Sequence, residues 1–158
     1  MKSPPKSSSG EAASHIFIIL VTLLQLIFFT LYHEYIGWPT TGSDGSVTRL
    51  SMLTDEYFIW LPIIITGSII VIITSIIMIF YKNYQFRKSA EIGFSIIGII
   101  ITVSLVSIFP FDFSVLPNDT AVDVVPIVVT VFFILLAVFY ATGALVMFIR
   151  LRRYISNE

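Results

Sequence analysis

Four long apolar stretches, separated by short polar segments, occupy most of the 158 residues of this chain. They run over residues 15–36, 57–81, 92–109 and 124–149. A helix needs about 20 apolar residues to cross a hydrocarbon layer about 30 Å thick, and each stretch is close to that length. The pattern therefore predicts an all-α fold, an integral membrane four-helix bundle with up-down-up-down topology.

The polar segments divide the chain into a central membrane domain, residues 15–153, and two tails. Residues 1–14 are rich in Ser, Pro and Lys, a composition that predicts a disordered tail, and residues 154–158 form a second, short tail. After the first apolar stretch, residues 38–46 consist of turn-forming types. Residues 47–53 then predict either a short strand or an amphipathic segment lying on the membrane surface.

Composition supports the membrane assignment and narrows the chemistry. Hydrophobic residues make up 56% of the chain and charged residues only 12%, against about 25% charged in ordinary soluble domains. A soluble domain of this size would still leave about 30% of its unfolded-chain surface exposed to water. The absence of cysteine excludes disulfides, thiolate metal sites and cysteine nucleophiles.

The basic residues are distributed unevenly between the two sides of the predicted bundle. The segments before the first stretch, between the second and third stretches, and after the fourth stretch hold Lys2, Lys6, Lys82, Arg87, Lys88, Arg150, Arg152 and Arg153. The other two loops hold one basic residue, Arg49. The positive-inside rule then predicts that both termini are cytoplasmic, and we expect a multi-pass protein of the cell membrane.

Polar residues on the opposite, outer side form the candidate site. The candidate outer-face polar cluster comprises Gln25, His33, Glu34, Asp112, Asp119 and Asp123. An amide at the mid-depth of a span, as at Gln25, seeks a partner on a neighbouring helix, so a structural hydrogen bond competes with a role in a substrate path. The outer carboxylates could attract cations, or could serve only as helix caps and solubilising loop residues.

Stripes of small residues predict which spans pack together, because they let helix backbones approach closely in lipid. The predicted helix-packing residues are Gly67, Thr74, Ser95, Gly98, Thr102, Ala137, Ala141 and Ala144. They lie on the second, third and fourth spans. The first span is bulky, and we expect it to lie against lipid or another protein.

Two similar motifs suggest an internal repeat. Asp55 is followed seven residues later by Pro62, and Asp119 is followed seven residues later by Pro126, each at the outer start of an inward-running span. Two tandem helical hairpins and chance similarity in Ile- and Val-rich sequence both explain this. Each proline is also expected to kink its helix.

The sequence contains no recognisable catalytic or metal-binding set. His15 and His33 lie on one predicted helix, about 27 Å apart at 1.5 Å per residue, so they cannot share a metal or haem within one copy. No acid or base lies deep within a span, which argues against a proton or ion pump. We therefore predict a non-catalytic protein without a cofactor and without a nucleic-acid partner.

The turn between the third and fourth stretches carries a resemblance. Phe109, Pro110 and Asp112, followed by Phe132-Phe133, resemble a broad group of uncharacterised prokaryotic membrane proteins in which a helix ends in Phe-Pro-x-Asp. The likeness covers about residues 51–148 and implies architecture more than mechanism. That group commonly has about six helices and a His shortly after the turn, both of which this chain lacks.

Three functional hypotheses follow. The leading one is an accessory, assembly or scaffold subunit that packs its first span against a membrane-protein partner or a second copy. The alternative is a small carrier or lipid- or quinone-binding protein, with an outer-leaflet cavity ringed by Gln25, His33, Asp112 and Asp123. A third, a haem protein, would need His33 from two copies.

Overall fold

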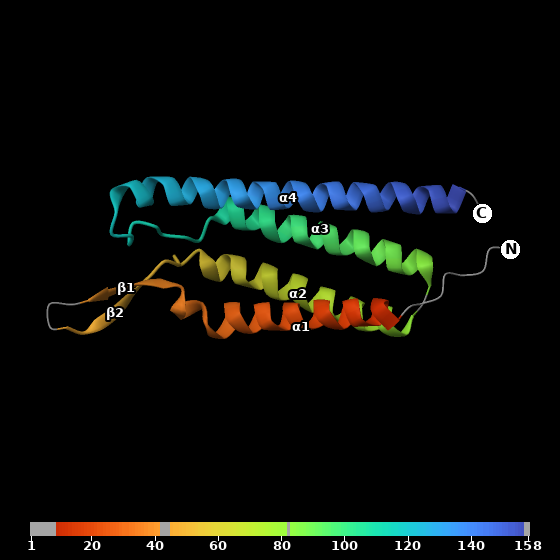
Figure 1. The fold of residues 1–158 in the computed structure, drawn as a ribbon, viewed down its shortest axis with the longest axis horizontal. Coiled ribbons are helices and arrows are strands. Elements are labelled where there is room, and N and C mark those ends of the chain that lie inside the picture. Colours follow the sequence, from red (N-terminus) through yellow and green to blue (C-terminus); the bar gives the residue numbers. More distant parts are fainter. Residues whose placement is uncertain (1–8, 42–44, 82, 157–158) are drawn as a thin grey trace.

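The computed structural model describes residues 9–41, 45–81 and 83–156. Its elements are α1 (Ser9–Leu31), the single 3-10 turn η1 (His33–Tyr35), β1 (Gly37–Thr41), β2 (Val47–Ser51), α2 (Tyr57–Phe80), α3 (Tyr84–Ile108) and α4 (Asp119–Ser156). The four long helices confirm the predicted all-α four-helix class. The small β1–β2 hairpin lies outside the helices (Figure 1).

All four helices are long and apolar enough to span a membrane. Their outward side chains are apolar too: α4 contains no buried residue, and Leu24, Phe139 and Leu135 are each more than 60% exposed. Soluble proteins rarely expose so much continuous apolar surface to water, whereas the same surface is stable in contact with lipid. The chain is therefore a multi-pass membrane protein whose helices contact the bilayer.

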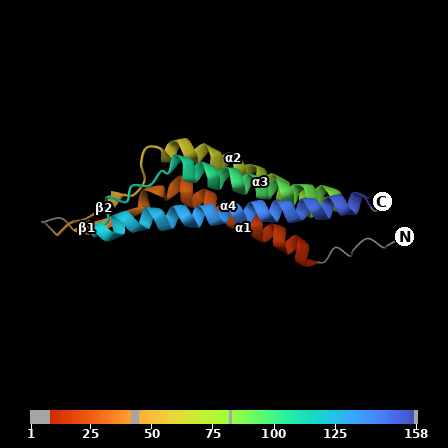
Figure 2. The ribbon, with the colours of Figure 1, turned by 90° about the horizontal axis from the view of Figure 1, so that it is seen from above.

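The helices pack in chain order and alternate in direction (Figure 1). α1 packs on α2, α2 on α3 and α3 on α4, whereas α1 and α4 are not closely packed. Figure 2 shows α1 inclined to α4 when the bundle is viewed from above. We call the end that carries β1 and β2 the hairpin end. The opposite end, where α1 begins and α4 ends, is the basic end.

The helices differ in length from the predicted spans. α1 begins at Ser9 rather than at residue 15 and ends at Leu31 rather than at residue 36, while residues 1–8 of the predicted tail lie outside the described residues. α3 begins at Tyr84 instead of residue 92 because the Asn83 side chain caps it, accepting a hydrogen bond from the Phe86 N–H at 3.1 Å. α4 continues to Ser156, so the predicted C-terminal tail is helical as far as that residue.

The hairpin end is tied together by backbone hydrogen bonds between two loops. β1 and β2 are antiparallel, with Gly37 opposite Ser51, so the strand alternative for residues 47–53 is the correct one as far as Ser51. A Cβ at Gly37 would lie 2.5 Å from the Leu50 carbonyl oxygen, which explains the glycine. The Asp112 N–H then donates to the Met52 carbonyl at 2.8 Å, joining the hairpin to the α3–α4 loop.

The buried core lies near the hairpin end, where α2 begins. Tyr57, Trp60, Ile64 and Leu105 are buried together, with Phe29 packed against them. The Phe29 and Trp60 rings meet edge to face at 5.3 Å. This core fixes the hairpin-end portions of α1, α2 and α3, and four of its residues, Phe29, Trp60, Ile64 and Leu105, line a cavity between the helices.

Candidate functional site

An apolar cavity of about 520 Å³ lies between the four helices. α1 lines it from Phe17 to Phe29 and α2 from Trp60 to Val71, so it spans the middle of the bundle and the half nearer the hairpin end. α3 and α4 supply the other walls. α1 and α4 both line the cavity but are not closely packed against each other.

Three polar side chains line this cavity without a hydrogen bond to any described residue: Gln25 on α1, Ser68 on α2 and Tyr140 on α4. By contrast, the hydroxyls of Thr22 and Thr102, which also line the cavity, donate to carbonyls one turn earlier in their own helices. The side-chain groups that could form hydrogen bonds with an occupant of the cavity are therefore one amide and two hydroxyls.

Helix contacts place these three groups at similar depths. A Cβ at Gly67 would meet Ile97 and Ile101, and a Cβ at Gly98 would meet the Tyr140 ring, so Ser68 and Tyr140 share one level. Phe29 lies opposite Trp60. Counting along the antiparallel α1 and α2 from that contact, Gln25 lies about 6 Å nearer the hairpin end than Ser68.

The cavity contains no charge: none of the described residues that line it is Asp, Glu, Lys, Arg or His. The indole N–H of Trp60 donates to the Ile101 carbonyl at 3.3 Å, which leaves this ring without a free donor. An occupant would consequently meet an apolar wall, the Gln25 amide and two hydroxyls.

Of the predicted outer-face cluster, the structure places only Gln25 in the cavity. His33 sits at the end of α1, where its ring stacks on Tyr57 at 5.3 Å and its Nδ1 lies 3.2 Å from the Thr30 carbonyl oxygen. Glu34, Asp119 and Asp123 are exposed at the hairpin end. Neither His33 nor any of the predicted carboxylates lines the cavity.

Asp112 belongs to the loop between α3 and α4. Hydrogen bonds from the hydroxyl and the backbone N–H of Ser114, the latter at 2.9 Å, hold the pKa of Asp112 below its usual range. This is a local turn that fixes the loop after Pro110. Among the described residues, no group of three or more His, Cys, Asp or Glu side chains could hold a metal ion.

The predicted packing residues fall into two groups. Gly67 and Gly98 lie at close helix contacts, and Ser95 and Thr102 are buried. The remaining four are less enclosed: Thr74, Ala137 and Ala144 are half-buried, and Ala141 is exposed.

Sequence reasoning missed Ser68 and Tyr140 as cavity residues. Ser68 follows Gly67, a glycine at a close helix contact, which was an available signal. Tyr140 carried none, because a tyrosine within an apolar stretch is ordinary.

No family model, no curated protein and no solved structure matches the chain. The resemblance carried by Phe109, Pro110 and Asp112 therefore stays a prediction. The geometry is that of a multi-pass membrane protein with an uncharged apolar cavity.

Proposed function

We propose that this protein binds a neutral lipophilic molecule in the cavity between its four helices. The observation that supports this is the set formed by Gln25, Ser68 and Tyr140, three polar groups on three helices without hydrogen bonds to the described residues. An amide or hydroxyl left unpaired in an apolar environment costs about 1–3 kcal/mol. An occupant with a hydrogen-bonding group would remove that cost.

The chemistry of the lining specifies the class of occupant. The amide of Gln25 and the hydroxyls of Ser68 and Tyr140 can all donate, so a carbonyl or hydroxyl group is the complementary partner. The absence of charged lining residues disfavours a carboxylate or phosphate in this position. A quinone, or another neutral lipid with a carbonyl group and an apolar tail, fits these requirements.

Size and access agree with this class. A cavity of about 520 Å³ lies within the range of about 300–1,000 Å³ that small-molecule sites occupy. An apolar tail would extend between α1 and α4, which are not closely packed, into the bilayer. Such a ligand exchanges sideways with the membrane and needs no aqueous opening.

Extraction of the purified protein tests the proposal. Protein isolated in a mild detergent is extracted with organic solvent, and bound neutral lipids are identified and counted by mass spectrometry. We expect Gln25→Leu and Ser68→Ala to lower the affinity for the extracted lipid by about 2- to 12-fold each, through one lost hydrogen bond. Ser107→Ala is the matched control, because Ser107 is exposed on α3 and does not line the cavity.

Two outcomes would refute this proposal. One is a purified protein that carries no neutral lipid and takes up none from added lipid mixtures. The other is retention of lipid by Gln25→Leu and Ser68→Ala at the level of Ser107→Ala.

A second candidate function is the accessory or scaffold subunit, favoured by the position of α1. This helix packs closely on α2 alone among the long helices, and it exposes Phe17, Leu24 and Leu31, each above 65%. A partner helix seated against α1 and α4 would cover this surface and supply a hydrogen-bond partner for Gln25. The scaffold function is supported if a protein co-purifies stoichiometrically with the wild type but not with Gln25→Leu. It is contradicted if native-detergent mass measurement shows a strict monomer with no co-purifying protein.

The proposed orientation follows from charge. The basic residues favour the basic end as the cytoplasmic end, in a cell membrane, which would place the cavity in the middle and outer parts of the bilayer. Reporter tags fused to each terminus should both read cytoplasmic. Tags that read on opposite faces would contradict this orientation.

A further inference from the structure

α3 and α4 meet in one continuous antiparallel register, which fixes the depth of every residue along them. The rings of Tyr84 and Tyr154 meet at 4.6 Å, and a Cβ at Gly98 would meet the Tyr140 ring. In both contacts the two residue numbers add to 238, and the contact of Gly143 with the Ser95 hydroxyl, 3.9 Å from a Cβ at the glycine, gives the same total.

This register brings cations of the two helices to the same depth. Lys88 and Arg150 also add to 238, so they lie level with each other, one turn or about 6 Å inside the Tyr84–Tyr154 contact. Because Lys88 is paired with Glu91, Arg150 is the uncompensated charge among the described residues at this level. An anion beside Arg150 would neutralise it.

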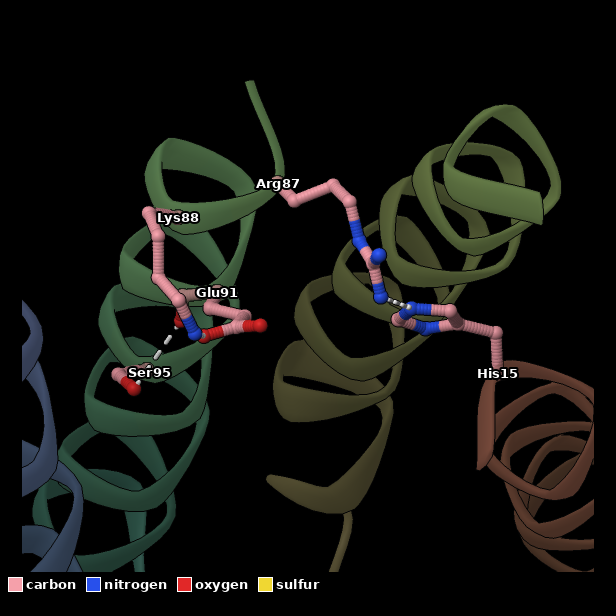
Figure 3. Close-up of polar contacts among 5 residues, drawn as sticks. All are labelled: His15, Arg87, Lys88, Glu91 and Ser95. Carbon is pink, nitrogen blue, oxygen red and sulfur yellow. Dashed lines mark hydrogen bonds and ion pairs between the residues drawn. The ribbon is translucent and has the colours of Figure 1, made fainter. Parts of the chain in front are cut away.

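Figure 3 shows how the beginning of α3 uses its two basic side chains. Arg87 reaches toward α1, where its Nη2 lies 3.4 Å from the Nε2 of His15. Lys88 turns to Glu91, with Nζ and Oε2 2.5 Å apart. The carboxylate of Glu91 is therefore already engaged and does not neutralise Arg150.

The end of α4 holds the uncompensated charge. Arg150, Arg152 and Arg153 are exposed, and in the described parts of the chain none of them forms an ion pair. They follow directly on the apolar stretch that ends at Ile149. Since α4 is 38 residues long, about 57 Å, its end extends past a hydrocarbon layer about 30 Å thick.

The aromatic contact marks the same layer. Tyr side chains are enriched where hydrocarbon gives way to lipid headgroups, and Tyr84 and Tyr154 pair at this level. Basic residues at this depth, next to the membrane, bind anionic lipids through their phosphate groups. The arginines and the tyrosines thus lie within about one turn of each other along α4, inside the interfacial layer of one leaflet.

We propose that the basic end of the α3–α4 pair binds the headgroup of an anionic phospholipid, with its phosphate between Arg150 and Arg153, which lie three residues apart on one face of α4, at the level of Lys88. This surface is separate from the neutral cavity and does not depend on the function proposed for it. The occupant is a lipid of the surrounding leaflet, because the cations lie at headgroup depth on a membrane-embedded helix pair.

Lipid retention measures this binding. The full-length protein is purified in detergent, mixed with equal amounts of phosphatidylglycerol and phosphatidylcholine, and the bound lipids are counted by native mass spectrometry. We expect phosphatidylglycerol to be preferred, and Arg150→Gln/Arg153→Gln to weaken its binding by about fivefold per arginine removed. The matched control is Arg49→Gln, which removes a cation at the hairpin end, where Arg49 lies 5.2 Å from the centre of the Tyr35 ring.

Three results would overturn the proposal. They are equal binding of both lipids, equal loss of phosphatidylglycerol in Arg49→Gln, and complete displacement of the lipid by millimolar inorganic phosphate, which would indicate a site for a free anion. Circular dichroism and gel filtration establish that the variants are folded, so that a change in lipid count reports on binding.

Discussion

Replacing Gly98 by alanine tests whether the α3–α4 contact is as close as the structure requires. A Cβ at this position would lie 2.9 Å from three carbon atoms of the Tyr140 ring, while carbon atoms pack best at about 3.5–4.0 Å. The added methyl therefore overlaps a flat, stiff ring by about 0.6–1.1 Å. Either the ring moves or the two helices separate.

The size of the effect follows from two opposing contributions. Overpacking of this kind costs about 1–3 kcal/mol, while alanine is favoured over glycine in a helix by about 0.8–1.0 kcal/mol. Gly93→Ala is the matched control, because it lies on the same helix and its Cβ would meet nothing within 4 Å. Since the helix preference cancels between the two variants, Gly98→Ala should be less stable than Gly93→Ala by about 1–3 kcal/mol.

Unfolding in mixed micelles, with increasing sodium dodecyl sulfate and detection by circular dichroism, gives the two stabilities. A double variant, Gly98→Ala/Tyr140→Leu, should recover part of the loss because leucine can move out of the way, and the coupling measures the contact itself. Equal stability of Gly98→Ala and Gly93→Ala would show that the ring does not lie on the glycine, and would refute the packing of α3 against α4.

Two further predictions concern the hairpin end. Tyr57→Phe should lower the free energy of unfolding by about 0.5–1.5 kcal/mol, because the Tyr57 hydroxyl donates to the Phe29 carbonyl, one of the last four carbonyls of α1 that have no partner within the helix; unchanged unfolding in mixed micelles would contradict this. The pKa of Asp112 is lowered in the folded protein by Ser114, so its contribution to stability is complete above the ordinary carboxyl pKa and is lost as the pH falls through the lowered value. Thermal unfolding of the wild type should therefore lose stability in acid relative to Asp112→Asn, and parallel pH profiles of the two proteins would be the contrary result.

Some element boundaries were readable from the sequence and others were not. Pro110 and the apolar run before it predicted the end of α3, which ends at Ile108. The sequence pattern predicts a later beginning for α3 than Tyr84, because the charges of Arg87 and Lys88 are typical of a loop. The cap at Asn83 was the signal that would have corrected this. Charged first turns are common in helices that begin outside the hydrocarbon.

The candidate site was predicted only in part. Gln25 was recognised because an amide at mid-depth of an apolar helix is unusual in itself. His33 and Asp112 were grouped with it as outer polar residues, but His33 stacks on Tyr57 and Asp112 closes a turn with Ser114. The position of each residue along its predicted span indicated that these residues share one side of the membrane. It did not indicate in which direction each side chain points.

The amino-acid sequence by itself determined that this chain crosses a membrane four times. The length and apolarity of each stretch set its free energy of transfer into lipid, independently of how the helices pack against one another. Only the tertiary structure decided that Gln25, Ser68 and Tyr140 line one cavity and that Lys88 and Arg150 lie level. Those relations depend on the rotation and the axial offset of each helix against its neighbours. Both are set by side-chain packing between helices, such as Gly98 against Tyr140, and the pattern of apolar residues along one helix does not contain them.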